Sequence, residues 1–150
     1  MQTREFRPLA AVALALAIAA APAVAADRPP VAPVEWQSVA KTDSVEAFVD
    51  PASIKALGAG LEANVKQNYA QPQPAAKKGK SYLSTGNIYR FDCTQRRVGL
   101  KDLRAYEGLD LQGKVVQKAT ARDKNVQWLD APVRTVFGEI LDFVCKAPGG

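Results

Sequence analysis

Residues Ser81–Arg97, SYLSTGNIYRFDCTQRR, form the stretch around which the rest of this chain is organised. Its aromatic and aliphatic residues predict an extended strand that runs up to Cys93, and Gly86-Asn87 within it predicts a bulge or a tight turn. A second cysteine, Cys145, lies beside the C-terminus. We predict that the two cysteines form a disulfide that ties this central strand to a C-terminal helix.

The first 25 residues have the pattern of a secretory signal peptide. Arg4 and Arg7 precede the uncharged apolar run Leu9–Ala21, and Ala23-Val24-Ala25 supplies the small residues of a signal-peptidase site. The run is about 13 residues long, whereas a bilayer span needs about 20, so a membrane anchor is the weaker interpretation. No cysteine follows the run to accept a lipid. We expect residues 1–25 to be removed and the mature protein to be periplasmic or secreted, without a stable membrane anchor.

The cysteine count and the absence of histidine limit the chemistry of the chain. Two cysteines are an even count in an oxidising compartment, so a structural disulfide is the default. Closing a loop of about 50 residues would stabilise the fold by about 4 kcal/mol. A redox pair is the alternative, but no Cys-x-x-Cys spacing is present to lower a thiol pKa. Histidine, the commonest metal ligand, is missing. We expect no metal site and no cofactor.

The mature chain is long enough for one modest hydrophobic core. Residues 26–33 are a proline-rich leader, and we expect residues 34–147 to form a single domain. Apolar and polar residues alternate along much of this domain, which predicts strands. In the first strand we expect Val34, Trp36 and Val39 to be buried. The expected strands cover residues 34–39, 44–49, 61–69, 81–93, 98–106 and 114–120.

A basic loop, Gln71–Lys80, interrupts this pattern. Its sequence, QPQPAAKKGK, is too polar and too rich in proline to contribute to a core, so we expect an exposed loop. Lys77, Lys78 and Lys80 are therefore a candidate binding loop, although a loop of this composition is most often only solvated.

Residues Pro132–Lys146 carry the helical spacing of the chain. Pro132 suits the first turn of a helix, and Gly138 costs the helix about 1 kcal/mol. Strands followed by a terminal helix predict an α+β fold, a curved antiparallel sheet with the helix packed on one face. The apolar stripe that would pack on the sheet consists of Val133, Val136, Phe137, Ile140, Leu141 and Val144.

Candidate catalytic groups are few. Asp50 and Asp92 are a conceivable carboxylate pair for hydrolysis. Ser81 and Ser84 lack both a histidine base and a Gly-x-Ser-x-Gly turn, so neither reads as a nucleophile. We therefore predict that the protein is not an enzyme.

The charged and aromatic residues have simpler structural interpretations. Beside Cys93, we expect Arg96 or Arg97 to bond Asp92 or a loop carbonyl and so to fix the end of the strand. The chain has a net charge of +5, which falls to +4 without Arg4, Glu5 and Arg7 and favours anionic surfaces or glycans over nucleic acid as partners. The larger aromatic residues belong to the core or the sheet faces, or form a binding patch where they group on the outer face: Trp36, Tyr69, Tyr82, Tyr89, Tyr106 and Trp128.

An ordered set of residues resembles the surface-adhesin protein E family of small exported bacterial proteins. The central element is Asp92-Cys93-x-x-Arg96, preceded by Phe91. The resemblance extends over most of the mature chain, from about Trp36 to Cys145. Its other elements are Val49-Asp50, Ser53-Ile54, Gly58, Tyr69, Tyr106, Val115-Val116 and Trp128.

The resemblance implies a roughly six-stranded antiparallel sheet backed by a C-terminal helix, with the two cysteines bridged. It also implies adhesion to host extracellular-matrix proteins such as vitronectin and laminin. Founding members of the family are lipid-anchored, and this chain lacks the corresponding cysteine. The leading hypothesis is an exported, non-enzymatic binding or adhesion module. The alternative is a soluble periplasmic structural or stress-associated protein with no host ligand. An open sheet edge would also allow a homodimer.

Overall fold

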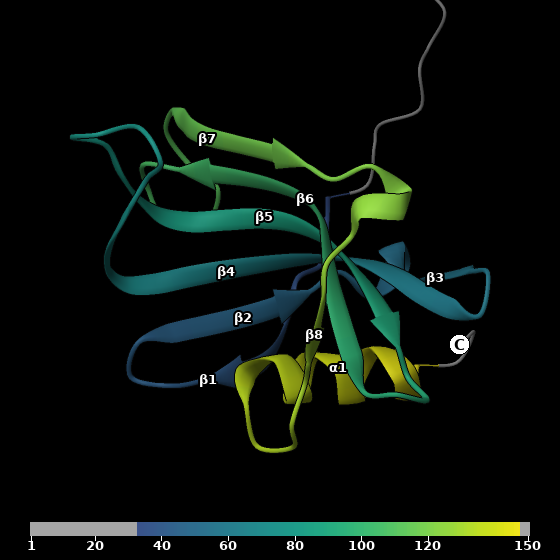
Figure 1. Cartoon of the computed structure of the whole chain (residues 1–150). Helices are drawn as coiled ribbons and strands as arrows, with labels where there is room; N and C mark the ends of the chain where they lie inside the picture. The colour runs from purple at the N-terminus through teal and green to yellow at the C-terminus, as the bar shows by residue number, and fades with distance from the viewer. Residues whose placement is uncertain (1–32, 148–150) are drawn as a thin grey trace, which may run out of the picture. The chain divides into compact units, whose positions relative to one another are not determined.

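The computed structural model describes residues 33–147, which form one antiparallel sheet and one α-helix (Figure 1). The predicted signal peptide and the predicted leader up to residue 32 lie outside the described residues. Within residues 33–147, no helix is long and apolar enough to cross a membrane. The elements are β1 (Gln37–Lys41), β2 (Val45–Val49), η1 (Pro51–Ser53), β3 (Lys55–Leu57), β4 (Gly60–Pro74), β5 (Ser81–Asp92), β6 (Arg97–Tyr106), β7 (Val115–Thr120), η2 (Asp123–Asn125), β8 (Trp128–Asp130) and α1 (Val136–Lys146).

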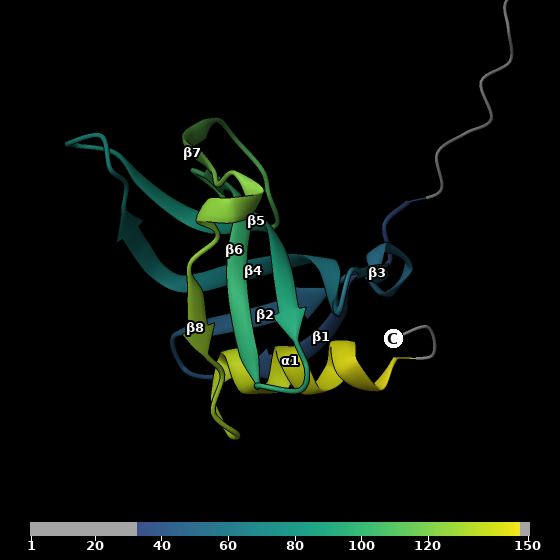
Figure 2. The same cartoon turned by 45° about the vertical axis from the view of Figure 1, so that its right-hand side comes forward.

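Six strands form the continuous path of the sheet, in the order β1-β2-β4-β5-β6-β7. All pairs are antiparallel; the short strand β3 pairs with the start of β4, and β8 pairs with the start of β6. Figures 1 and 2 show the sheet curling so that the turn between β5 and β6 comes down beside α1, which lies across one face. The predicted fold class, a curved six-stranded sheet with a C-terminal helix on one face, is confirmed.

The core lies between α1 and the face of the sheet that it covers. Alternation along β4 buries Leu61, Ala63 and Val65, as predicted, because successive side chains of a strand point to opposite faces. From the helix, Ile140 and Val144 are fully buried against this face. Each such side chain stabilises the fold by about 2 kcal/mol relative to an exposed position.

The prediction for the first strand was wrong in its position. The strand covers Gln37–Lys41 and not residues 34–39, and Val34 is 52% exposed. Pairing with β2 sets these bounds, because Gln37 lies opposite Val49, the last residue of β2. Trp36 is half-buried and lies just before the strand.

The basic loop is shorter than predicted, because β4 continues to Pro74. The pairing of β4 with β2 ends at Tyr69, so Pro72 and Pro74 lie beyond the partner strand, where a missing N–H is tolerated. Pairing of β4 with β5 resumes at Gln73 after an irregularity. The loop that remains comprises residues 75–80.

The Gly86-Asn87 pair does not form a turn. Both residues lie within β5, which continues unbroken from Ser81 to Asp92. The irregularity in its pairing with β6 falls one residue later, between Ile88 and Tyr89.

The helix begins at Val136, four residues later than predicted. Arg134 has a φ of +63°, which is not helical, and the Thr135 hydroxyl accepts a hydrogen bond from the Gly138 N–H at 3.0 Å as the N-cap. The Thr135 hydroxyl also donates to the Pro132 carbonyl at 2.7 Å. A side chain at Gly138 would overlap that same carbonyl, so the close approach of the entering chain explains the glycine.

Candidate functional site

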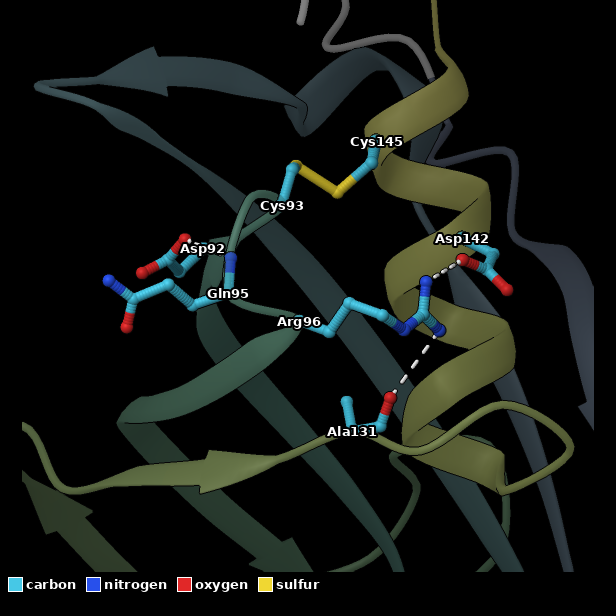
Figure 3. The surroundings of a disulfide bond; sticks show 7 residues. All are labelled: Asp92, Cys93, Gln95, Arg96, Ala131, Asp142 and Cys145. Atoms are coloured by element: carbon cyan, nitrogen blue, oxygen red, sulfur yellow. Dashed lines mark hydrogen bonds and ion pairs between the residues drawn. A yellow bond between two sulfur atoms is a disulfide. The ribbon is translucent and has the colours of Figure 1, made fainter.

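The predicted disulfide joins the turn after β5 to the last turn of α1 (Figure 3). Cys93 and Cys145 are 52 residues apart in sequence, and their Cα atoms are 5.9 Å apart. The bond closes residues 93–145, which include β6, β7, β8 and α1, into one covalent loop. It fixes the C-terminal end of the helix to the turn that follows β5.

Arg96 forms a second link between the same turn and the helix, as Figure 3 shows. Its guanidinium donates to Asp142 Oδ1 at 2.6 Å and to the Ala131 carbonyl at 3.4 Å. The Arg96 carbonyl accepts from the Ala131 N–H at 2.9 Å. The Arg96 guanidinium holds the pKa of Asp142 below its ordinary value. Arg96 therefore joins the turn, the end of β8 and the helix.

Asp92 closes the turn at the end of β5. Its carboxylate accepts from the Gln95 N–H and from the Arg97 guanidinium, each at 2.9 Å. The Gln95 N–H, followed by Arg97, lowers the pKa of Asp92. The Arg97 guanidinium lies 5.5 Å from the centre of the Trp128 ring. The predicted role of an arginine in fixing this strand end is confirmed.

The carboxylates of this region are held in the ionised form. Asp92 and Asp123 line one hollow of about 500 Å³, which does not include Asp50. Lys101, followed by Arg90, lowers the pKa of Asp123, just as the pKa of Asp92 is lowered. A general acid needs a pKa raised towards neutrality, so these two carboxyls are not tuned for acid catalysis.

Ser84 has a structural role. Its hydroxyl is buried, donates to the Gly108 carbonyl at 2.6 Å and accepts from the Leu111 N–H at 2.9 Å. These bonds hold the connection between β6 and β7 against the sheet. Ser81 lies exposed at the start of β5.

The lysine loop, residues 75–80, projects from the end of the β4–β5 hairpin, at the far end of the sheet from α1 (Figures 1 and 2). Within the loop, the Ala75 N–H donates to the Lys80 carbonyl at 2.9 Å. The Ala76 N–H donates to Gln117 Oε1 of β7 at 2.8 Å. The loop is therefore fixed at its base and exposed at its tip.

Among the lysines on and near this loop, one has a carboxylate of the described chain close to it and the others do not. Lys80 lies 3.7 Å from Glu107, whereas Lys77 and Lys78 form no ion pair within the described part of the chain. Lys114 and Lys118, on either side of the start of β7, form none with residues 33–147 either. Nothing in the sequence connects these last two lysines with the loop, because β7 meets the loop through the long-range hydrogen bond from Ala76 to Gln117.

Lys66 of β4 lies on the outer face of the sheet, the face opposite α1, and makes several contacts there. Its side chain is only 8% exposed, its ammonium lies 4.2 Å from the Phe48 ring centre and 5.5 Å from that of Trp36, and it donates to Asp110 at 2.7 Å. Asn68 also donates to Asp110, at 2.8 Å. The alternation that predicts a strand over residues 61–69 gives no signal of this burial, because a lysine on the polar side of such a strand is expected to be solvated.

Comparisons with known proteins agree with this geometry. The family model described as surface-adhesin protein E matches residues 36–146. The solved structure of protein E from Haemophilus influenzae resembles the fold with a TM-score of 0.51 at 12% identity, covering 75% of this chain and 88% of that chain. Curated protein sequences gave no match.

The chain belongs to the surface-adhesin protein E family, because the family model matches most of its length. Family membership supports an adhesin-like surface or secreted protein. The structural likeness, at its low identity, carries the fold alone.

Proposed function

We propose that this protein is an exported, non-enzymatic adhesion module that binds host extracellular-matrix proteins through the lysine loop. The observation that carries the proposal is the family match over residues 36–146. The expected partners are vitronectin and laminin, which the resemblance to the family implies. The domain boundaries proposed for the mature protein are residues 34–147, after a signal peptide and a short leader.

The lysine loop supports the proposal by its exposure and its charge. Lys77 and Lys78 are exposed and have no ion-pairing partner within residues 33–147, so an acidic patch on a partner would meet two uncompensated cations. The fixed base of the loop limits the entropy lost when a partner is bound. Interactions of this kind act mainly on the rate of association and weaken with salt.

The test is the binding of the mature protein to immobilised vitronectin and laminin. The triple variant Lys77→Ala, Lys78→Ala, Lys80→Ala should bind at least tenfold more weakly. The matched control is Arg122→Ala, Lys124→Ala, Arg134→Ala, which removes the same charge from exposed basic residues elsewhere. Equal binding by the two triple variants would remove the loop from the proposal, and no binding by the unmodified protein would remove these partners.

Location provides a second test of the adhesion role. Protease treatment of intact cells should remove the protein, whereas release by osmotic shock would favour the periplasmic structural alternative.

A homodimer would pair through β1 or β7, the two ends of the sheet path. Light scattering at increasing concentration measures this association.

A further inference from the structure

A small hollow lies on the sheet face opposite α1. It has a volume of about 200 Å³. Asn64 of β4, one of the residues that line it, stands between the buried core residues Ala63 and Val65. Its main lining residues are Trp36, Asn64, Gly86, Asp102, Arg104 and Tyr106.

Gly86 makes the hollow possible. It sits in a cross-strand row between Lys66 of β4 and Arg104 of β6, both of which carry long side chains. A methyl group at Gly86 would lie 3.5 Å from the Leu111 side chain and 3.8 Å from the Tyr106 ring, which are ordinary contact distances. The backbone therefore tolerates a side chain here, and the glycine leaves the floor of the hollow open.

Two basic residues lie next to each other at one side of the hollow: Arg104, which lines it, and Lys118 of the neighbouring strand. Arg104 lies directly opposite Lys118 on β7, and like charges at such positions repel. Among residues 33–147, Asp102 supplies the one carboxylate that lines the hollow; it lies 3.8 Å from Arg104 and also accepts a hydrogen bond from Thr120 at 2.5 Å. The Arg104 side chain is 60% exposed, so its pair with Asp102 is screened by solvent and its guanidinium is accessible to a ligand.

We propose that this hollow binds one unit of an anionic saccharide. The Trp36 and Tyr106 rings offer flat apolar walls for a sugar ring, and Asn64 and Asp102 offer a donor and acceptors for its hydroxyls. Arg104 and Lys118 pair with a carboxylate or sulfate on the sugar and relieve their mutual repulsion. The volume is below the 300–1,000 Å³ typical of drug-sized ligands and suits a single ring.

The experiment measures the affinity of the mature protein for three probes by calorimetry. These are a heparin-derived oligosaccharide, the same oligosaccharide after complete desulfation, and a neutral glucose oligomer. If only the intact heparin oligosaccharide binds, the hollow recognises the sulfate groups. If the desulfated oligosaccharide also binds, the hollow recognises the carboxylates as well. Equal binding of the neutral oligomer would overturn the proposal.

Three variants locate the site. Arg104→Gln should raise the Kd at least tenfold, Lys118→Gln should raise it about threefold, and Gly86→Val should abolish binding by filling the floor. Lys124→Gln, which removes an exposed lysine of η2, is the matched control and should leave the Kd unchanged. Circular-dichroism melting verifies that each variant folds.

Nuclear magnetic resonance chemical shifts distinguish binding in the hollow from general electrostatic attraction. Titration should move the backbone amide signals of Gly86 and Arg104 and leave those of the lysine loop in place. If the Lys77→Ala, Lys78→Ala, Lys80→Ala variant weakens oligosaccharide binding as much as Arg104→Gln does, the binding is general electrostatic attraction and the proposal fails.

Discussion

The two faces of the sheet are built by different means. On the helix side, apolar residues such as Phe91 and Ile140 are fully buried, and the disulfide and Arg96 fix the helix to the sheet. On the opposite face, the contacts are polar: Lys66 with Asp110, and Ser84 with the β6–β7 connection. We therefore expect the helix side to supply most of the stability, which leaves the outer face and the lysine loop for the proposed binding.

The largest loss of stability should follow from removing the disulfide on the helix side. The double variant Cys93→Ala, Cys145→Ala should lower the free energy of unfolding by about 4 kcal/mol, because the closed loop of 52 residues restricts the unfolded chain. Urea denaturation measures the loss. Reduction of the unmodified protein should reproduce it, and a loss below about 1 kcal/mol would mean that Arg96 and the core hold the helix without the disulfide.

The helix side is also the region that the sequence predicted best. Alternation in β4 and the stripe containing Ile140 and Val144 gave the buried face, and the even cysteine count gave the disulfide. The alternation and the helical stripe are periodic patterns of apolar residues, and burial follows from them directly. The start of the helix was misplaced because Arg134 adopts a positive φ and Thr135 caps the helix, and neither feature is periodic.

The outer face was harder to predict, because its contacts join residues far apart in sequence. Lys66 and Asp110 are 44 residues apart, and a lysine that shares a strand face with Asn64 and Asn68 is expected to be solvated. Trp36 and Tyr106 appeared only as aromatics that would form a patch if they grouped on the outer face. Both line the small hollow there, together with Gly86, a grouping that depends on strand register.

A smaller effect should follow from Asp110→Asn on the outer face. Asparagine keeps the shape and tolerates the left-handed backbone at this position, where φ is +53°, but it leaves Lys66 without its counter-charge. We expect a loss of about 1–2 kcal/mol in the free energy of unfolding at pH 7. Asp110 is 61% exposed, so solvent screening keeps the effect below that of the disulfide.

The pH dependence of this loss identifies the ion pair as its cause. Lys66, followed by Asn68, lowers the pKa of Asp110 in the folded protein, so its stabilisation is complete above the unfolded pKa of about 4. The stabilisation is lost as the pH falls through the lower folded pKa. The difference between the two proteins should therefore be constant from about pH 8 to pH 5 and shrink below pH 4. A difference that does not change with pH would contradict the ion pair, and Asp43→Asn, at an exposed carboxylate with no ion pair among the described residues, is the control.

The smallest effect on stability should come from the lysine loop. Lys80 and Glu107 are 3.7 Å apart and both at least 40% exposed, and such surface pairs contribute little. The base of the loop is fixed by backbone groups, which the substitutions Lys77→Ala, Lys78→Ala and Lys80→Ala leave unchanged. The triple variant should therefore unfold within about 0.5 kcal/mol of the unmodified protein. A larger loss, measured by urea denaturation, would show that the loop stabilises the sheet, and any loss of partner binding in that variant would then have a structural cause. An unchanged stability together with weakened binding would place the two roles in separate regions of the molecule.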